Sequence, residues 1–328
     1  MGIRLAKKSS MKRVLLLVST LVLVSAILVS WFAYYNYRLS ESELDKRLEK
    51  AIDFLLIQYT PQLRLCCEAP YVAPNTYWLA SDNLLAYHAL EPYYPNISMT
   101  VYLELEGRDG LKSELYETLF GESVPLPIKE KVTYVIEQHD NYVIKTDVHN
   151  CTSAFPYWDE YANLLICSAL SLHWEGNHTG ALRLFDKAVG MWDGKGLRDR
   201  AIEEAEENLL GLYETYKLAL LLYASRILQR PLPFRSQLES VLWTTQRVSD
   251  GGMVTHYNGS TTPITPIGDA NTETTSLTII AYRYTPTTNS YSFPSLGTQC
   301  CACRDGAESL RRFYRLFLHE PSKSSLII

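Results

Sequence analysis

Hydrophobic residues first gather in an uninterrupted run near the N-terminus. Val14 to Ala33 spans 20 residues without a charge, and the 13 residues before the run hold five Lys and Arg and no acid. About 20 apolar residues in a helix cross a bilayer, and basic residues favour the cytoplasmic side. The pattern predicts a cytoplasmic basic segment over 1–13 and a transmembrane anchor over 14–35, with the rest of the chain extracytoplasmic. A long cleaved signal peptide and a buried core helix are the alternatives.

Beyond this run, apolar residues recur at helical spacing in two kinds of segment. Segments 77–90, 158–174, 213–224 and 271–282 each begin with polar or aromatic residues and a carboxylate, and then become apolar on nearly every side. Segments 179–192 and 236–247 are amphipathic. Because a helix that is apolar all round is buried, we expect an inner layer of the first kind and an outer layer of the second.

A different pattern lies between 131 and 148. Residues 131–136 and 142–148 are rich in β-branched and aromatic residues, and His139-Asp140-Asn141 separates them, which predicts a β-hairpin. The expected fold class is therefore mainly α: an N-terminal transmembrane helix, then an α/α-toroid-like domain of helical hairpins over 40–285 with this small insertion. Residues 286–328 are expected to form a tail that is rich in Ser, Thr and Pro, contains cysteines and ends in a short amphipathic helix.

The toroid expectation also has a motif behind it. Leu242 and Gln246 precede Gly251-Gly252, and an apolar helix with a polar first turn follows. This spacing resembles a repeat of the protein prenyltransferase β-subunits and terpene cyclases, with one extra residue before the glycines and Met253 where an aromatic is usual. The resemblance implies an α/α toroid, a class that also includes glycan-active enzymes. It carries over no catalytic residue, because neither an Asp-rich cyclase motif nor the prenyltransferase zinc ligands can be matched.

In a toroid the N-termini of the inner helices open on one face, so the polar first turns would surround one cleft. Paired carboxylates across a cleft suit glycoside hydrolysis, and a loop histidine is a second proton carrier. The candidate catalytic residues are Asp82, Asp159, Glu214, Glu273 and His256. The candidate ligand-binding residues are Trp78, Asn83, Trp158, Asn163, Tyr213, Asp250, Gly251, Gly252, Tyr257 and Asn271. Helix capping accounts for many of the same residues without any chemistry, and Asp250-Gly251-Gly252 also suits a helix C-cap and turn.

The charge balance and the sequence motifs argue against several classes of partner and cofactor. Without the five basic residues of 1–13, 26 of the 31 Lys and Arg remain against 36 Asp and Glu, a balance that argues against nucleic acid. Seven cysteines show no CxxC spacing, and HExxH, GxSxG and phosphate-binding glycine loops are absent. We therefore expect no metal and no cofactor.

Three functions remain open, and the sequence leaves undecided whether the protein is an enzyme. The leading one is a membrane-anchored module that binds a glycan, a peptide or a protein partner in a polar, aromatic-lined cleft. The first alternative is a carbohydrate-active hydrolase or lyase that uses paired carboxylates. The second is a scaffold for membrane partners, because Ala181, Phe185 and Ala188 resemble the spacing of a tetratricopeptide helix, although a single copy is no array.

Overall fold

The computed structural model describes residues 25, 41–111, 113, 115–206 and 211–286. It is about 50% helical and 20% strand, and the strands form three sheets, so the expectation of a mainly helical fold is wrong. Within the described part, none of the helices combines the length and apolar character needed to cross a membrane, so no described helix supports the expected transmembrane anchor. The segment expected as that anchor, except Ser25, lies outside the described residues, as do residues 1–13 and the tail from 287 on.

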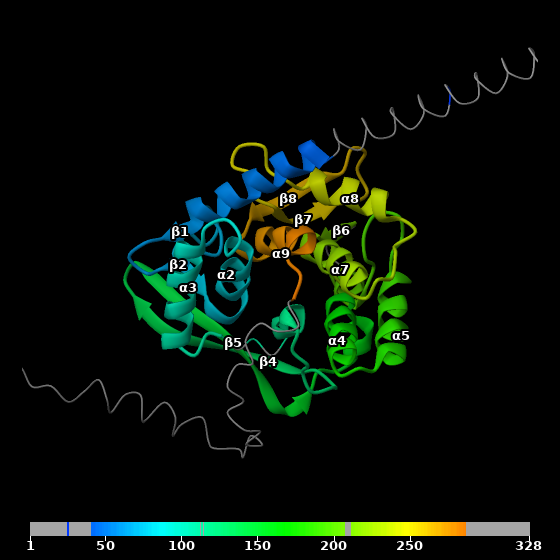
Figure 1. Ribbon diagram of the computed structural model, residues 1–328, viewed down its shortest axis with the longest axis horizontal. Coiled ribbons are helices and arrows are strands. Elements are labelled where there is room, and N and C mark those ends of the chain that lie inside the picture. Colours follow the sequence, from blue (N-terminus) through cyan, green and yellow to red (C-terminus); the bar gives the residue numbers. More distant parts are fainter. Residues whose placement is uncertain (1–24, 26–40, 112, 114, 207–210, 287–328) are drawn as a thin grey trace, which may run out of the picture.

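Four buried helices form the centre of the molecule. They are α2 (Leu84–Leu90), α9 (Thr272–Arg283), α7 (Thr215–Ile227) and α4 (Ala162–Trp174). The packing contacts run from α2 to α9, from α9 to α7 and from α7 to α4, so the four follow one another in an arc (Figure 1). Each of α4, α7 and α9 is buried on nearly all sides, because apolar and small residues fill its sequence without a polar stripe.

Amphipathic helices cover this arc. The helix at 41–58, α3 (Pro95–Gly107), α5 (His178–Val189) and α8 (Arg235–Thr244) lie outside it. Helix α5 buries Ala181, Phe185 and Ala188 against the core and exposes its other faces. Asn177 fixes where α5 begins, because its side chain accepts a hydrogen bond from the Gly180 amide. The short helix α6 (Arg200–Glu206) precedes the central α7.

The structure contains more strands, and longer ones, than the sequence pattern predicted. Strands β4 (Lys129–His139) and β5 (Tyr142–Ala154) form an antiparallel hairpin that is longer than expected, and β3 (Thr76–Trp78) pairs with β5 in parallel. A second sheet has the order β6-β7-β8, from β6 (Leu212–Glu214), β7 (Val254–Asn258) and β8 (Thr265–Ala270). A third joins β1 (Tyr59–Thr60) to β2 (Leu65–Cys66). Segments expected as polar loop or helix start are thus strands.

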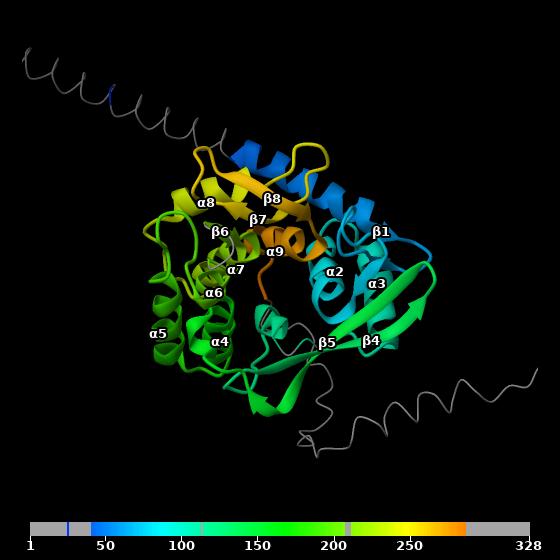
Figure 2. The ribbon, with the colours of Figure 1, turned by 180° about the vertical axis from the view of Figure 1, so that it is seen from behind.

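The β4–β5 hairpin spans the open side of the helical arc. Figures 1 and 2 show it running between the α2 end and the α4 end, with the 3-10 helix η2 (Tyr116–Phe120) in the space between. On the α2 side, a π-helical turn, η1 (Leu79–Asn83), precedes α2 and contacts both β5 and α9. Single π turns inside helices are frequent at functional sites. The polar ends of the helices, the hairpin and η2 therefore surround one region.

Candidate functional site

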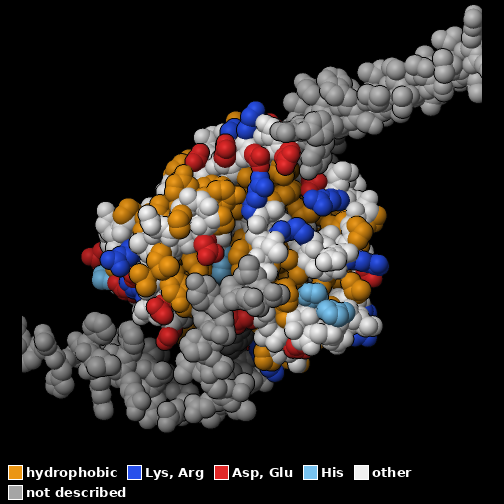
Figure 3. All heavy atoms as spheres, in the orientation of Figure 1, with side chains coloured by type: hydrophobic (Ala, Val, Ile, Leu, Met, Phe, Trp, Pro, Cys, Tyr) orange, Lys and Arg blue, Asp and Glu red, His pale blue; other side chains and the backbone are white. Residues whose placement is uncertain are grey.

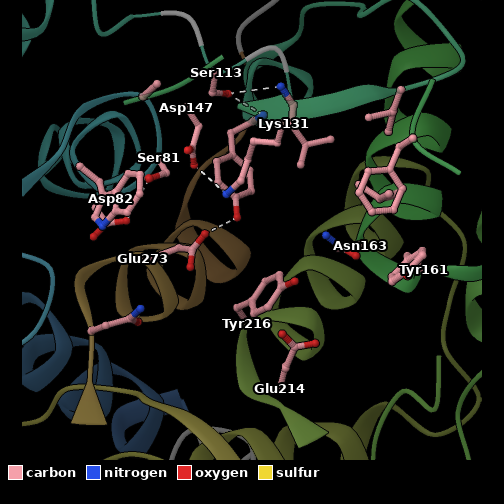
Figure 4. Close-up of a pocket in the computed structure, with 18 of the residues that line it drawn as sticks. Ser81, Asp82, Ser113, Lys131, Asp147, Tyr161, Asn163, Glu214, Tyr216 and Glu273 are labelled. Atoms are coloured by element: carbon pink, nitrogen blue, oxygen red, sulfur yellow. Dashed lines mark hydrogen bonds and ion pairs between the residues drawn. The ribbon is translucent and has the colours of Figure 1, made fainter. Parts of the chain in front are cut away.

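A cavity of about 420 Å³ lies where these elements meet, a volume within the usual range for small-molecule sites. Its walls are polar and aromatic, and they come from the starts of three central helices, from the hairpin and from η2 (Figure 4). Its ionisable and aromatic lining residues are Glu68, Trp78, Asp82, Tyr116, Lys129, Lys131, Asp147, Phe155, Tyr161, Glu214, Tyr216 and Glu273. Five of these residues are Asp or Glu and two are Lys, so acidic residues outnumber basic ones in the lining.

Asp82 is the most deeply buried of the five carboxylates. It lies in η1, only 3% of the residue is exposed, and Ser81 donates a hydrogen bond of 3.1 Å to its Oδ1. Its Oδ2 is buried without a hydrogen-bond partner among the described residues. Burial raises the pKa of Asp82 well above its ordinary value of 3.8, and the nearby carboxylates Glu273 and Glu68 raise the pKa further. Asp82 therefore holds its proton more strongly than an ordinary aspartate does.

Glu273 lies beside it in the first turn of α9. The Tyr116 hydroxyl donates a hydrogen bond of 2.5 Å to Glu273 Oε1 across 157 residues of sequence. Burial raises the pKa of Glu273, and the hydrogen bond from Tyr116 opposes this effect because it stabilises the carboxylate. The start of α9 itself is fixed by Asn271, whose side chain accepts from the Thr274 amide at 2.9 Å and which also lines the cavity.

Glu214 has a different environment. It ends β6, directly before α7, and its carboxylate forms an ion pair with Lys217 one turn into that helix. Lys217 is only 2% exposed and also lies 2.7 Å from Asp199 Oδ2. Asp199 in turn accepts a hydrogen bond of 2.8 Å from the Ala162 amide at the start of α4. Glu214 is thus a carboxylate held in place by a buried cation, and Figure 4 shows it on a different side of the cavity from Asp82.

Several lining residues come from outside the expected first turns. Trp78 donates from Nε1 to Glu68 Oε2 at 2.8 Å, and Lys145 Nζ lies 5.2 Å from the centre of its ring, so the indole is rigidly placed. Lys131 Nζ and Asp147 Oδ2 form an ion pair of 2.6 Å across the hairpin. Glu68, Tyr116, Lys131 and Asp147 were missed from the sequence. The alternation of polar residues on the two hairpin strands was the available signal for Lys131 and Asp147.

Two of the expected tryptophan and carboxylate residues do not line the cavity. Asp159 lies in the 3-10 turn η3 (Trp158–Glu160), ahead of α4, and forms an exposed ion pair of 2.6 Å with Lys187. The hydrogen bond from Lys187 lowers the pKa of Asp159. Trp158 packs against the central core. Asn163 does line the cavity, because it lies on α4 itself.

Asn83 and the tyrosine pair have structural roles. Asn83 is fully buried and accepts a hydrogen bond of 2.6 Å from the Cys66 amide, which ties η1 to β2. The rings of Tyr213 and Tyr257 stack with their centres 5.5 Å apart across β6 and β7. The Tyr213 hydroxyl donates to Asp193, and the Tyr257 hydroxyl donates to the Lys195 carbonyl. These tyrosines hold the 193–196 loop and do not line the cavity.

His256 and the glycine loop also lie outside the cavity lining. His256 is opposite Glu214 in the β6–β7 register, and burial lowers its pKa. Asp250 pairs with Arg247 at 2.7 Å in a turn. Gln246 donates to the carbonyls of Arg47 and Gly251, so the motif Gln246 to Gly252 joins the turn to the helix at 41–58. This loop is a packing element in the structure.

No group of three or more His, Cys, Asp or Glu side chains in the described ranges is arranged to hold a metal ion. Cys66, Cys67 and Cys167 are free and buried, and burial raises the pKa of the Cys67 thiol to about 11. No protein-family model, curated protein or solved structure matches the chain. Inferences about function therefore depend on the geometry of the cavity alone.

Proposed function

We propose that this domain is a carbohydrate-active hydrolase that cleaves a glycosidic bond in the cavity. One observation carries the proposal: the cavity combines a carboxyl group whose pKa burial raises well above its ordinary value, Asp82, with a carboxylate paired with the buried Lys217, Glu214. Two carboxyl groups whose environments push their protonation states apart are the usual equipment for acid and base roles. Glycosidases use such a pair on either side of the scissile bond.

In this mechanism each group has one task. Asp82 gives its proton to the oxygen of the leaving sugar as the bond between that oxygen and the anomeric carbon breaks. Glu214 accepts a proton from the water that attacks the anomeric carbon. Lys217 holds Glu214 in place through their ion pair, and Asp199 holds Lys217 from its other side. Glu273, with its hydrogen bond from Tyr116, strengthens the negative environment that keeps the proton on Asp82.

The remaining walls suit a sugar. Carbohydrates present apolar ring faces and many hydroxyl groups, so their sites combine aromatic planes with amides and carboxylates. Trp78 offers a fixed aromatic plane, and Tyr161 and Tyr216 add two more. The amides of Asn163 and Asn271 provide both donors and acceptors for hydroxyl groups.

The test is hydrolysis of a panel of aryl glycosides and oligosaccharides by the full-length protein. We expect Asp82→Asn and Glu214→Gln each to lower kcat by roughly 10²–10⁴-fold on any substrate that the wild type cleaves. Asp159→Asn is the matched control, because this carboxylate is exposed outside the cavity, and its kcat should not change. Equal activity of all three variants would overturn the assignment of Asp82 and Glu214.

A binding module without catalysis is the second candidate, and the fixed Trp78 favours it. An indole held by Glu68 and Lys145 is preorganised to stack on a ligand, whether or not a bond is broken. In this case a sugar of the panel would raise the Tm of the wild type without being hydrolysed, and Trp78→Ala would abolish the shift. Absence of both hydrolysis and binding over the panel would reject both candidates.

A further inference from the structure

Two histidines meet at the C-terminal end of α4, whose first turn lines the cavity. His173 lies in the last turn of α4, and His178 is the first residue of α5. Their Nδ1 atoms are 3.2 Å apart, and their rings lie 5.0 Å apart between centres. They line a hollow of about 300 Å³ together with Leu182, Ile227, Leu228 and Gln229. Figure 3 shows histidine side chains gathered over this α4–α5 side of the surface.

The separation of the two nitrogens matches the geometry of a metal ion. Zinc binds imidazole nitrogen at about 2.0–2.1 Å with tetrahedral angles, which places two such ligands about 3.3 Å apart. The Nδ1 atoms already have this spacing without any movement of the two helices. Without a metal, the same two atoms share a hydrogen bond in which one Nδ1 carries the proton and the other accepts it. When each ring carries its proton on Nε2, both Nδ1 lone pairs are free to bind a cation.

The backbone around the hollow also favours a cation. Helix α4 ends at Trp174 and α7 ends at Ile227, so the C-termini of two 13-residue helices border the pair. The C-terminus of a helix carries partial negative charge and attracts cations. The opposing N-terminus, that of α5, has its Gly180 amide already bonded to Asn177. Burial and the neighbouring His178 lower the pKa of His173, so its lone pair is available at neutral pH.

We propose that His173 and His178 form a two-histidine site for a divalent transition metal ion such as Zn²⁺, Ni²⁺ or Cu²⁺. Each histidine supplies the lone pair of Nδ1, and water fills the other coordination positions in the hollow. In the neutral pair, binding needs only a tautomer shift that moves a ring proton from Nδ1 to Nε2. The ion would tie the end of α4 to the start of α5. The site is independent of the cavity and of the hydrolase proposal.

The test is titration of the full-length protein with Ni²⁺ by calorimetry. Cys300, Cys301 and Cys303 are changed to Ser in every sample, because thiolates of this cluster would bind the same ions. We expect one equivalent of Ni²⁺ to bind, and both His173→Ala and His178→Ala to weaken its binding at least tenfold. His139→Ala is the matched control: this exposed histidine is paired with Glu137, and its removal should leave the equivalent intact. Unchanged affinity in both variants would overturn the site.

A second measurement separates binding from misfolding. Ni²⁺ should raise the Tm of the wild type and of His139→Ala, and should not raise that of His178→Ala or His178→Gln. The electron paramagnetic resonance spectrum of one bound Cu²⁺ should show coupling to two imidazole nitrogens, falling to one or none in each variant. If the metal-free Tm of a variant equals that of the wild type and Ni²⁺ still raises it equally, the proposal is wrong.

Discussion

Lys217 and Asp199 form a buried ion pair of 2.7 Å, and the same lysine contacts Glu214 at the edge of the cavity. Asp199 also accepts from the amides that begin α4 and α6, so its charge is shared between the backbone and the lysine. Of these three side chains, Glu214 is the one that lines the cavity. The Lys217–Asp199 pair therefore connects the start of α4 to Glu214, the proposed general base.

Replacing Lys217 with Met should lower the free energy of unfolding by about 3–5 kcal/mol, because it leaves the buried Asp199 without its cation and breaks the ion pair with Glu214. Urea unfolding of the full-length protein measures this change. Lys187→Met is the control, since Lys187 forms an exposed pair with Asp159 and should cost at most about 1 kcal/mol. Equal losses in the two variants would show that the buried pair has no special weight.

The raised pKa of Asp82 predicts a pH-dependent difference between the wild type and Asp82→Asn. Below the ordinary value of 3.8 the carboxyl is neutral in both the folded and the unfolded chain. Between 3.8 and the raised folded pKa only the unfolded chain ionises, so the wild type loses about 1.4 kcal/mol of stability per pH unit while the variant does not. Unfolding curves at pH 4 and pH 8 should show a relative gain for the variant at pH 8.

Asp159→Asn serves as the control for this experiment. The pKa of Asp159 is lowered by Lys187, so its contribution has the opposite sign: stability is present above 3.8 and is lost as pH falls through the folded pKa. Asp159 is exposed, which makes the effect small. Parallel curves for the wild type and Asp82→Asn across the whole range would mean that Asp82 is ionised in the folded protein.

Hydrophobic periodicity locates the central helices well because it reports burial directly. Apolar runs at 84–90, 162–174, 215–227 and 272–283 are the cores of α2, α4, α7 and α9. The carboxylates just before or within the first turns of three of them, Asp82, Glu214 and Glu273, line one cavity. Asp159 does not, because an extended residue, Tyr161, separates its 3-10 turn from α4. Spacing in the sequence could not distinguish this break from a continuous helix.

The strands outside the β4–β5 hairpin were missed for a different reason. Strand β6 is three residues long and pairs with β7, more than 40 residues away, so neither has a local signal of its own. His256 and Tyr257 were expected in a polar loop, but they lie in β7. Glu68 lies in a bend after β2 and Tyr116 in the 3-10 helix η2, and neither segment has a hydrophobic periodicity that would reveal it. Such non-local contacts depend on the whole fold.

Gly251 should not tolerate a side chain. It has a φ of +84°, and a Cβ there would lie 2.3 Å from the Lys50 carbonyl oxygen. We expect Gly251→Ala to lower the free energy of unfolding by roughly 2–4 kcal/mol, from left-handed strain and overpacking against the helix at 41–58. Gly107→Ala is the control, because Gly107 ends α3 and has nothing within 4 Å of a Cβ. This variant should leave the free energy of unfolding unchanged or raise it by about 0.5–1 kcal/mol. Two neutral variants would contradict both the backbone strain and the close packing assigned to Gly251.

Tyr116→Phe should destabilise the protein more at pH 8 than at pH 4. The hydroxyl stabilises the ionised form of Glu273, so its loss raises the pKa of that carboxyl further and lowers stability where the carboxylate would form. We expect a loss of about 1–3 kcal/mol at pH 8 and less at pH 4, measured by urea unfolding. Tyr223→Phe is the matched control, because the Tyr223 hydroxyl donates to the neutral Leu119 carbonyl, and its cost should not depend on pH. If both variants lose the same amount at both pH values, the Tyr116–Glu273 bond contributes packing but no control of charge in the cavity.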